Sequence, residues 1–444
     1  MSDTWLWMTA ADLGRAFEAG EIDPREVTEV YLSAIESHPQ APGIYARVTA
    51  DRARAEADAA AARARAGLRH GPLDGVPVSW KDLFDTAGTA TEAGSALLAG
   101  RVPERDAAVL AHAGRAGLVC LGKTHLTELA FSGIGINPVT ATPPNINDPE
   151  LAPGGSSSGA AASVAFGLAA AGIGSDTGGS IRVPSSWNDL VGLKPTHGLL
   201  SLEGVVQLCP RFDTPGPLCR SVEDAALLLA ALSGAPAPDL AGASLDGASL
   251  LVLDTAGIGP TADGQARALE AALDPLRAAG ARTERAALAS VAEAMALAPC
   301  IFAAEAYGTC REVIEARPEL MFAPVLDRFR SGEAFSAPDY VAAWQKLDRL
   351  RAEYLAETAG FDAVVLPTTP NLAPNVEALL ADHALFMREN LMTLRNTRIG
   401  NLMGLCALSL PSGTPGCGLM VMAAPGSESR LLRLGAAIEA ALGA

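Results

Sequence analysis

Two glycine- and serine-rich stretches carry residue types that could attack a carbonyl carbon. Residues 153–159 read PGGSSSG, and residues 175–182 read SDTGGSIR. Glycine beside a serine lets backbone N–H groups approach a substrate oxygen, because no Cβ stands in the way. One helix and one strand are expected between the stretches, so that Ser156 and Ser180 can meet in space. Glycine and serine are also common in structural turns, and these residues alone leave that interpretation open.

A serine nucleophile needs a base, and no histidine has a distinctive setting. Residues 155–159 fit the G-x-S-x-G pattern of a nucleophile elbow, which requires a strand before it and an acid and a histidine after it. The residues before the pattern are loop-like, and only His197 and His383 follow it. The elbow interpretation is therefore weak.

Lys81 offers a different base. It follows the apolar run 76–80, which resembles a short strand entering the interior. Burial disfavours the charged form of lysine and lowers its pKa, so a buried Lys81 could accept a proton. A surface turn at Lys81 and Asp82 accounts for the local sequence equally well.

One phosphate-binding pattern is interpreted as a chance match. Residues 117–124 fit G-x-x-x-x-G-K-[ST], but the four intervening residues, LVCL, form an apolar strand. A phosphate cradle needs a flexible loop whose backbone N–H groups converge.

Composition and charge exclude several classes of protein. Hydrophobic residues make up 49% of the 444 residues, which is ample for a large buried core. The net charge of −17 repels nucleic-acid phosphates and anionic membranes, so we expect no direct nucleic-acid binding and no membrane docking. The uncharged stretch 151–175 is interpreted as a loop and a buried helix over 160–173, which is too short to span a bilayer.

The cysteines and the N-terminus indicate the compartment. Seven cysteines are scattered without a C-x-x-C pair, which suits reduced thiols better than disulfides or a zinc site. The first residues carry no basic start before an apolar run, so no secretory signal is expected. We therefore predict a cytoplasmic protein with no metal.

Periodicity predicts an α/β chain with one large mixed sheet sandwiched between helix layers. Thr9 or Asp12 is expected to cap a first helix, and Asp23-Pro24 to open a second, both within 9–37. Further helices are expected at 50–67, 106–116, 160–173, 264–316, 337–357 and 428–442, and strands at 76–80, 118–121, 249–253, 364–367 and 407–411.

Five stretches of the chain stand out: GPLDGVPVSWKD (71–82), LGKTHLTELAF (121–131), PGGSSSGAAASVAFG (153–167), GSDTGGSIRVP (174–184) and VGLKPTHG (191–198). Together they resemble the amidase signature family, and their joint occurrence is far more specific than any single motif. Weaker likeness at 361–374 and 404–413 extends the resemblance over nearly the whole chain. It implies one amidase domain over 1–444, with a helical N-terminal segment over about 1–67 and a variable substrate-side region over about 260–360.

The resemblance implies hydrolysis of carbon–nitrogen amide bonds by a serine–cis-serine–lysine triad, without a cofactor. The lysine of the family's G-V-P-x-x-x-K-D run falls on Lys81, the relay serine on Ser156 and the nucleophile of D-T-G-G-S on Ser180. The family's remaining positions give two sets. The oxyanion hole falls on the backbone N–H groups of Thr177, Gly178, Gly179 and Ser180, and the supporting residues on Asp176, Arg182 and Ser157.

Substrate contacts are less clearly marked. Phe131 follows a family-like helix, Gly155 precedes the relay serine, and Tyr307 lies in the 290–330 region that caps the site in relatives. Residues 396–401 (NTRIGN) are polar within an apolar region, which indicates either an approach to the cleft or a structural turn. Residues 415–426 depart from the family's usual tail, so substrate identity does not carry over.

The resemblance leaves several activities open. The first is a free-standing amidase acting on a small carboxamide, and the second is the glutaminase (A-type) subunit of a tRNA-dependent amidotransferase. A hydrolase of ureido compounds such as biuret or allophanate is a third, and a scaffold that has lost catalysis is disfavoured by the complete triad. A glutaminase subunit would need an arginine for its substrate, for which Arg328, Arg330 and Arg349 are available. Either a homodimer or a small partner subunit is compatible with these activities.

Overall fold

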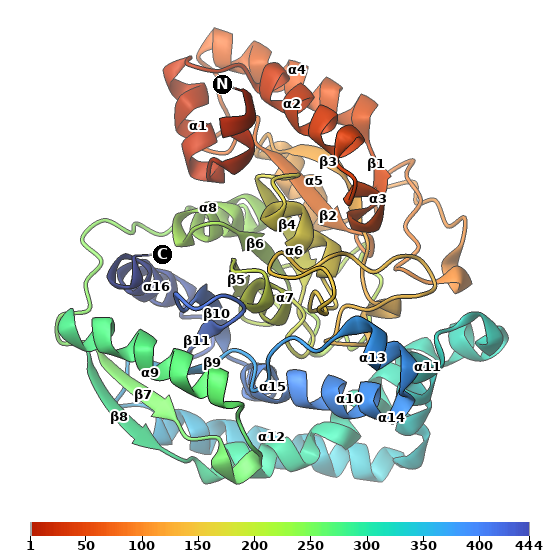
Figure 1. The fold of residues 1–444 in the computed structure, drawn as a ribbon, viewed down its shortest axis with the longest axis vertical. Coiled ribbons are helices and arrows are strands. Elements are labelled where there is room, and N and C mark those ends of the chain that lie inside the picture. The colour runs from red at the N-terminus through yellow and green to blue at the C-terminus, as the bar shows by residue number, and fades with distance from the viewer. Residues whose placement is uncertain (1, 444) are drawn as a thin grey trace.

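One mixed β-sheet of eleven strands runs through residues 2–443, the part of the chain that the computed structural model describes (Figure 1). The strand order is β1-β3-β2-β4-β6-β5-β10-β11-β9-β7-β8. In Figure 1 the sheet descends from β1, beside the N-terminal helices, to β7 and β8, beside α9. The strands are β1 (Tyr45–Val48), β2 (Pro77–Lys81), β3 (Val119–Thr124), β4 (Ala171–Ser175), β5 (Val191–Lys194), β6 (Pro215–Cys219), β7 (Ser249–Leu253), β8 (Arg282–Ala286), β9 (Ala363–Pro367), β10 (Cys406–Pro411) and β11 (Gly418–Ala423).

Helices pack on both faces of this sheet, as the alternating α/β pattern predicts. A Cβ added at Gly435 of α16 would lie 2.4 Å from Leu408, whereas a Cβ added at Gly192, which pairs with Ser409, would meet Ser185 of α7. Neighbouring residues of a strand point to opposite faces, so α16 and α7 cover opposite faces. The helices are α1 (Ala10–Ala19), α2 (Pro24–Ser37), α3 (Ala41–Ile44), α4 (Ala50–Ala66), α5 (Ala108–Arg115), α6 (Ser158–Ala165), α7 (Arg182–Trp187), α8 (Val222–Ser233), α9 (Asp263–Ala278), α10 (Ala289–Ala316), α11 (Ala323–Arg330), α12 (Ala337–Glu357), α13 (Val376–Ala381), α14 (His383–Thr393), α15 (Arg395–Leu402) and α16 (Glu428–Leu442).

Short 3₁₀ turns lie between these elements. They are η1 (Ser2–Trp7), η2 (Ala96–Leu98), η3 (Glu128–Ala130), η4 (Ala256–Ile258), η5 (Pro318–Leu320) and η6 (Ser331–Ala334).

The pairing of β2 with β4 brings two chain segments to one edge of the sheet. The strands are parallel, with Ser79 opposite Gly172 and Trp80 opposite Ile173. Parallel strands end at the same edge, so the ends of β2 and β4, Lys81 and Ser175, become neighbours. All five residues of each strand are buried, which carries these two side chains into the interior.

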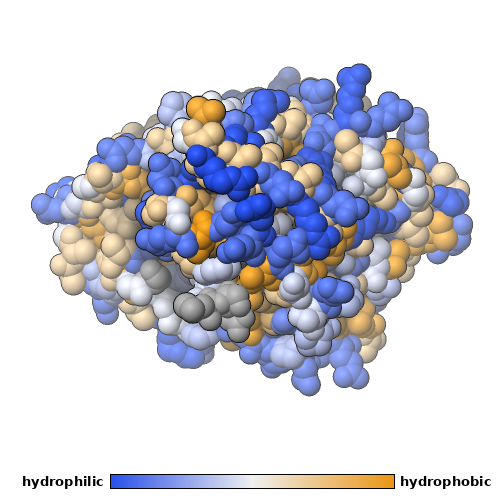
Figure 2. Space-filling model, turned by 90° about the horizontal axis from the view of Figure 1, so that it is seen from above, coloured by the Kyte–Doolittle hydropathy of each residue, from blue (hydrophilic) through white to orange (hydrophobic). Residues whose placement is uncertain are grey.

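The helix starts follow the capping signals of the sequence. The side chain of Thr9 accepts a hydrogen bond from the backbone N–H of Asp12 at 3.0 Å, and Asp23 accepts one from Arg25 at 2.8 Å ahead of Pro24. Helix α4 buries only alanines, and its charged residues face outward. The surface seen in Figure 2, from above the N-terminal helices, is accordingly mostly hydrophilic with scattered apolar side chains.

Two expected helices end differently in the structure. Helix α6 stops at Ala165, eight residues before the predicted end at 173. The predicted helical stretch 264–316 is interrupted by β8, an edge strand with the sequence RTERA. Its side chains are mostly exposed, so the apolar alternation that marks a strand is missing.

Within residues 2–443, α10 is long and apolar enough to span a membrane by length and composition, with a mean hydropathy of 1.4 in its most apolar window. Ten of its residues are buried, and it packs against α11, α12 and α15. Those contacts are typical of the core helix of a globular protein.

Beside the end of β2, Asp82 pairs with Lys123 of β3. Their Oδ1 and Nζ atoms are 3.0 Å apart, and the side chains are 2% and 0% exposed. Lys346 and Glu293 form a matched pair at 2.7 Å on the surface, where the side chains are 43% and 54% exposed.

We expect Lys123→Met to lower the free energy of unfolding by about 3–5 kcal/mol, because the buried Asp82 would lose its partner at 3.0 Å and keep only one cation, Arg47, at the longer distance of 3.4 Å. Lys346→Met should change the free energy of unfolding by less than about 1 kcal/mol, because exposed pairs contribute little. Urea unfolding monitored by tryptophan fluorescence measures both. Equal midpoints for the two variants would contradict the stabilising role of the buried pair.

Candidate active site

Lys81, the last residue of β2, lies at the centre of a buried hydroxyl cluster. Its side chain is fully enclosed, and its Nζ is 2.7 Å from Ser156 Oγ and 2.9 Å from Ser175 Oγ. Among the described residues no carboxylate forms an ion pair with Lys81. The surface-turn interpretation of Lys81 is therefore excluded.

The surroundings of Lys81 set its pKa. Burial removes the water that would stabilise the ammonium group and lowers the pKa of Lys81 to about 7. The negative charges of Asp213 and Asp176 raise it in part. A lysine with this pKa exchanges a proton readily near neutral pH.

The loop before α6 holds Ser156 against Lys81. The Gly155–Ser156 peptide bond is cis, the isomer that the family resemblance implies. Ser157, the next residue, accepts a hydrogen bond from the backbone N–H of Ser175 at 3.2 Å and donates its hydroxyl to the Ser175 carbonyl at 3.1 Å. These bonds fix the Ser156 loop to the end of β4.

Gly155 is packed closely against neighbouring backbone. Its N–H donates to the carbonyl of Gly133 at 2.8 Å. A Cβ at this position would lie 2.7 Å from the Cα of Gly135 and from Thr127 Oγ1. Only glycine fits here, and a contact between Gly155 and the substrate stays a prediction.

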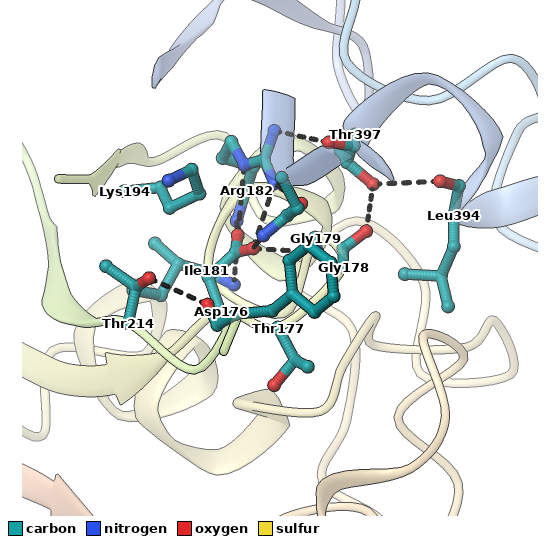
Figure 3. Close-up of polar contacts among 12 residues, drawn as sticks. Asp176, Thr177, Gly178, Gly179, Ile181, Arg182, Lys194, Thr214, Leu394 and Thr397 are labelled. Atoms are coloured by element: carbon teal, nitrogen blue, oxygen red, sulfur yellow. Dashed lines mark hydrogen bonds and ion pairs between the residues drawn. The ribbon is translucent and has the colours of Figure 1, made fainter. Parts of the chain in front are cut away.

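Asp176 organises the loop that follows β4 (Figure 3). It accepts hydrogen bonds from the backbone N–H groups of Gly179 at 2.8 Å and Ile181 at 3.2 Å. Arg182 donates to both of its carboxylate oxygens, at 3.0 and 2.8 Å. Burial alone would raise the pKa of Asp176, but the Arg182 guanidinium lowers it to about 2. The supporting positions predicted for Asp176 and Arg182 thus form one buried ion pair.

Three of the four predicted oxyanion donors have free N–H groups. Within residues 2–443 no hydrogen bond involves the backbone N–H groups of Thr177, Gly178 or Ser180. The prediction that Gly179 also donates to the oxyanion is not met by this geometry, because its N–H is already bonded to Asp176. Gly179 instead serves the loop. A Cβ there would lie 2.1 Å from Thr397 Oγ1, and its φ is +140°.

Ser180 lies beside Ser156 through the backbone. The N–H of Ser157 donates to the carbonyl of Ser180 at 3.2 Å. The hydroxyl of Ser180 has no hydrogen-bond partner among the described residues, and its oxygen is not fully enclosed. The structure thus connects Lys81 to Ser156 directly, and it leaves the Ser180 hydroxyl free to meet a substrate.

Several residues of the site were not identified from sequence patterns. Ser175 is the second hydroxyl on Lys81, although it lies in the stretch SDTGGS as an unremarked strand end. Asp213 accepts a hydrogen bond from Thr177 Oγ1 at 2.5 Å and has no motif around it. Thr397 and Asn401 lie in the segment 396–401, whose polar residues within an apolar region were the sequence signal that could have identified them. The structure makes this segment part of helix α15, and it does approach the loop.

Helix α15 supports residues 176–180, the oxyanion loop, which carries the predicted oxyanion donors (Figure 3). Thr397 Oγ1 donates to the carbonyl of Gly178 at 2.7 Å, and Asn401 Nδ2 donates to Asp176 Oδ1 at 2.9 Å. Arg182 donates to the Thr397 carbonyl at 2.8 Å and to Asn401 Oδ1 at 2.6 Å. Residues more than 200 positions apart thus determine the shape of one loop.

The predicted substrate contacts separate into two outcomes. Phe131 is buried, its ring is 4.6 Å from that of Phe329, and the guanidinium carbon of Arg328 is 4.2 Å from its centroid. The structure does not place Tyr307 at the site. Its hydroxyl lies 3.5 Å from Glu315, a partly exposed residue that pairs with Arg330. Tyr307 was predicted as a substrate contact because the region 290–330 caps the site in relatives. In this structure its side chain projects from α10 toward the exterior.

Neither later histidine supports the nucleophile-elbow alternative. Nε2 of His197 lies 2.8 Å from the carbonyl oxygen of Pro210, and His383 contacts Asp327 at the surface. Lys123, the lysine of the rejected phosphate pattern, lies in β3 and pairs with Asp82. In the described part of the chain no group of three His, Cys, Asp or Glu side chains is arranged to hold a metal ion.

Comparison with known proteins identifies the family. A sequence model described as amidase matches residues 26–432. The chain is 35% identical to 2-amino-5-chloromuconic acid deaminase of Comamonas testosteroni, over 98% of this chain and 97% of the relative. It is 33% identical to the A-type subunit of glutamyl-tRNA(Gln) amidotransferase from Anaeromyxobacter sp. (strain K), over 97% and 96%.

A solved structure shows the same fold. The native peptide amidase of Stenotrophomonas maltophilia superposes with a TM-score of 0.84 at 27% identity, over 98% of this chain and 97% of that one. Both the sequence match and the structural match extend over nearly the full length. The chain therefore belongs to the amidase family of enzymes, which hydrolyse carbon–nitrogen amide bonds.

Proposed function

We propose that the protein hydrolyses a small carboxamide through a seryl acyl-enzyme, with Ser180 as nucleophile, Ser156 as proton relay and Lys81 as base. One observation carries this proposal. A fully buried Lys81 lies 2.7 Å from the hydroxyl of Ser156, which is held beside the Ser180 loop. The pKa of about 7 leaves about half of Lys81 neutral near that pH, so it can accept a proton.

In the first half of the reaction, Ser180 Oγ forms a bond to the amide carbonyl carbon. Its proton passes to Ser156 while the Ser156 proton passes to Lys81. The Ser180 hydroxyl must turn toward Ser156 for this step, and such contacts often tighten only when substrate binds. The backbone N–H groups of Thr177, Gly178 and Ser180 face the developing oxyanion, where each donor typically contributes ~10²–10³ in kcat.

In the second half, the relay runs in reverse. Lys81 returns a proton through Ser156 to the leaving nitrogen, the carbon–nitrogen bond breaks, and ammonia or an amine departs. Water then attacks the acyl-enzyme and regenerates Ser180, so that amide and water yield acid and amine. Asp176 and Asp213 stabilise the transient ammonium of Lys81 by charge without touching it.

Similarity to the amidotransferase subunit favours a second candidate, a glutaminase that passes ammonia to a partner. The hydrolysis of a ureido compound is a further alternative with the same nucleophile. We also propose a cytoplasmic location, where the seven free cysteines would stay reduced. Ammonia release by the purified chain alone, from an amide panel that includes L-glutamine, separates the first two candidates.

Ser180→Ala should lower kcat/KM by at least about 10⁴-fold, because the nucleophile is removed. Ser156→Ala should lower it by about 10²–10⁴-fold, because proton transfer loses its relay. Ammonia release under matched conditions measures both variants.

Ser158→Ala is the matched control, since Ser158 lies two residues from Ser156 and its buried hydroxyl has no hydrogen-bond partner. This control should keep its activity. Full activity in Ser180→Ala would show that the nucleophile is assigned wrongly.

Activity should also depend on the protonation of Lys81. Below pH ~7 we expect kcat/KM to fall about tenfold per pH unit, because only neutral Lys81 accepts the proton. Above pH ~7 the profile should level off. Intrinsic fluorescence over the same range checks that the fold persists. A flat profile from pH 5 to pH 9 is incompatible with Lys81 as the base.

A further inference from the structure

A cleft of about 710 Å³ opens between α12 and the segments that follow β5 and α15. None of Lys81, Ser156 and Ser180 lines it, so it is separate from the candidate active site. Its volume falls in the range of small-molecule sites, about 300–1,000 Å³. Asn401 lines its wall and donates to Asp176 Oδ1 at 2.9 Å, so the cleft reaches a residue that supports the oxyanion loop.

Lys194, the last residue of β5, lines the deepest part of this cleft. It is 1% exposed, and its Nζ donates to the carbonyl of Pro195 at 2.7 Å. An ammonium group has three N–H donors, and in the described part of the chain this is its one hydrogen bond, with no ion pair. Figure 3 shows Lys194 beside Arg182 and Asp176 with no bond drawn to either. Burial lowers the pKa of Lys194 to about 8, which leaves most of it charged at pH 7.

Two arginines add positive charge around Trp344 of α12. The guanidinium carbons of Arg211 and Arg351 lie 4.5 and 5.3 Å from the Trp344 ring centroid. Arg351 also donates to the Leu402 carbonyl at 2.7 Å and lies 3.5 Å from Asp348, an exposed carboxylate. Arg211 forms no ion pair with any described residue. A cation over an aromatic ring keeps its charge, since the contact contributes only about 0.5–1 kcal/mol at exposed sites.

The remaining carboxylate beside Arg211 is engaged elsewhere. Glu305 accepts the backbone N–H of Arg211 at 2.8 Å and the hydroxyl of Tyr340 at 2.6 Å. Lys194, Arg211 and Arg351 therefore outnumber Asp348, the one carboxylate that lines the cleft, although the chain as a whole carries a charge of −17. The cleft is thus a cationic site in an acidic protein.

Apolar side chains form the rest of the wall. The Phe212 ring stacks on that of Trp344, with centroids 5.2 Å apart. Val341 and Leu355 project from α12 beside them and are 53% and 37% exposed. Covering this surface gains about 25 cal/mol per Å² only if the ligand has an apolar body, so a hydrated inorganic ion uses the cleft poorly.

We propose that this cleft binds a small aromatic carboxylate. Its carboxylate meets the unused N–H donors of Lys194, its ring lies against Trp344 and Leu355, and Arg211 contributes positive charge at the mouth. A charge-assisted hydrogen bond to a buried ammonium is strong, and an aromatic ring gains additional stabilisation from an aromatic wall. The site lies outside the proposed reaction and does not depend on it.

Benzoate is the probe, with benzyl alcohol as its neutral counterpart and inorganic phosphate as the anion without an apolar body. In isothermal titration calorimetry of the wild-type protein, benzoate should bind at least about 10-fold more tightly than either compound. Equal affinity for benzoate and benzyl alcohol would overturn the proposal. Tighter binding of phosphate than of benzoate would do so as well.

Variants locate the binding event. Lys194→Met and Arg211→Met should each weaken benzoate binding by about 10- to 100-fold. Arg211 is exposed, so Arg211→Met keeps the fold even if the buried Lys194→Met destabilises it. Arg349→Met is the matched control and should bind benzoate like wild type, because Arg349 is an exposed residue of α12 that does not line the cleft.

Tryptophan fluorescence gives a local readout of the same site. Benzoate should change the emission of the wild-type protein and of Trp7→Phe, because Trp7 lies outside the cleft, and should leave Trp344→Phe unchanged. A full response in Trp344→Phe, or unchanged affinity in Arg211→Met and Lys194→Met, would place benzoate elsewhere and overturn the proposal.

Discussion

The removal of Lys81 from water is the constraint on which the site depends. A lysine with a carboxylate in contact would stay protonated and could not act as a base. Asp213 and Asp176 both lie near enough to affect its pKa, yet each carboxylate is engaged elsewhere. Asp213 is bonded to Thr177 and to the N–H groups of Leu208 and Cys209. The two carboxylates therefore raise the pKa of Lys81 only by their charge, without contact. The groups that contact its Nζ are the hydroxyls of Ser156 and Ser175.

The oxyanion loop depends in turn on Arg182. This side chain is fully buried, and its cost is offset by Asp176 on the loop and by acceptors on α15. Asp176 uses the same two oxygens to hold the N–H groups of Gly179 and Ile181. The ion pair thus turns the chain so that three other N–H groups remain free. In the proposed mechanism a substrate oxygen meets these donors already in place, which is the condition for electrostatic stabilisation of a transition state.

Sequence reasoning recovered the parts of the fold and of the site that are encoded locally. The strand at 76–80, the caps at Thr9 and Asp23, and the helices at 337–357 and 428–442 follow from periodicity and capping residues. Strand β8 was missed because its exposed edge carries no apolar alternation.

The site shows the same limit. Lys81 and Ser156 meet as the family resemblance implies, whereas Asp213 could be placed only by the fold. Gly179 and Tyr307 were misassigned, since a motif specifies which residue is present and not whether its N–H or hydroxyl is already bonded.

The buried arginines differ in how far the protein itself satisfies their guanidinium groups. Arg182 is saturated by the protein, so it shapes a loop that any amide could use. Arg328 and Arg398 are also buried, but among the described residues their side chains donate no hydrogen bond, and the guanidinium of Arg328 lies over the ring of Phe131 instead. Arg328 lies within the region 260–360, far along the sequence from Lys81 and the serines. The acceptors on α15 are directed to the arginine that fixes the loop after β4, so the shape of that loop depends on one buried ion pair and its two supports from α15.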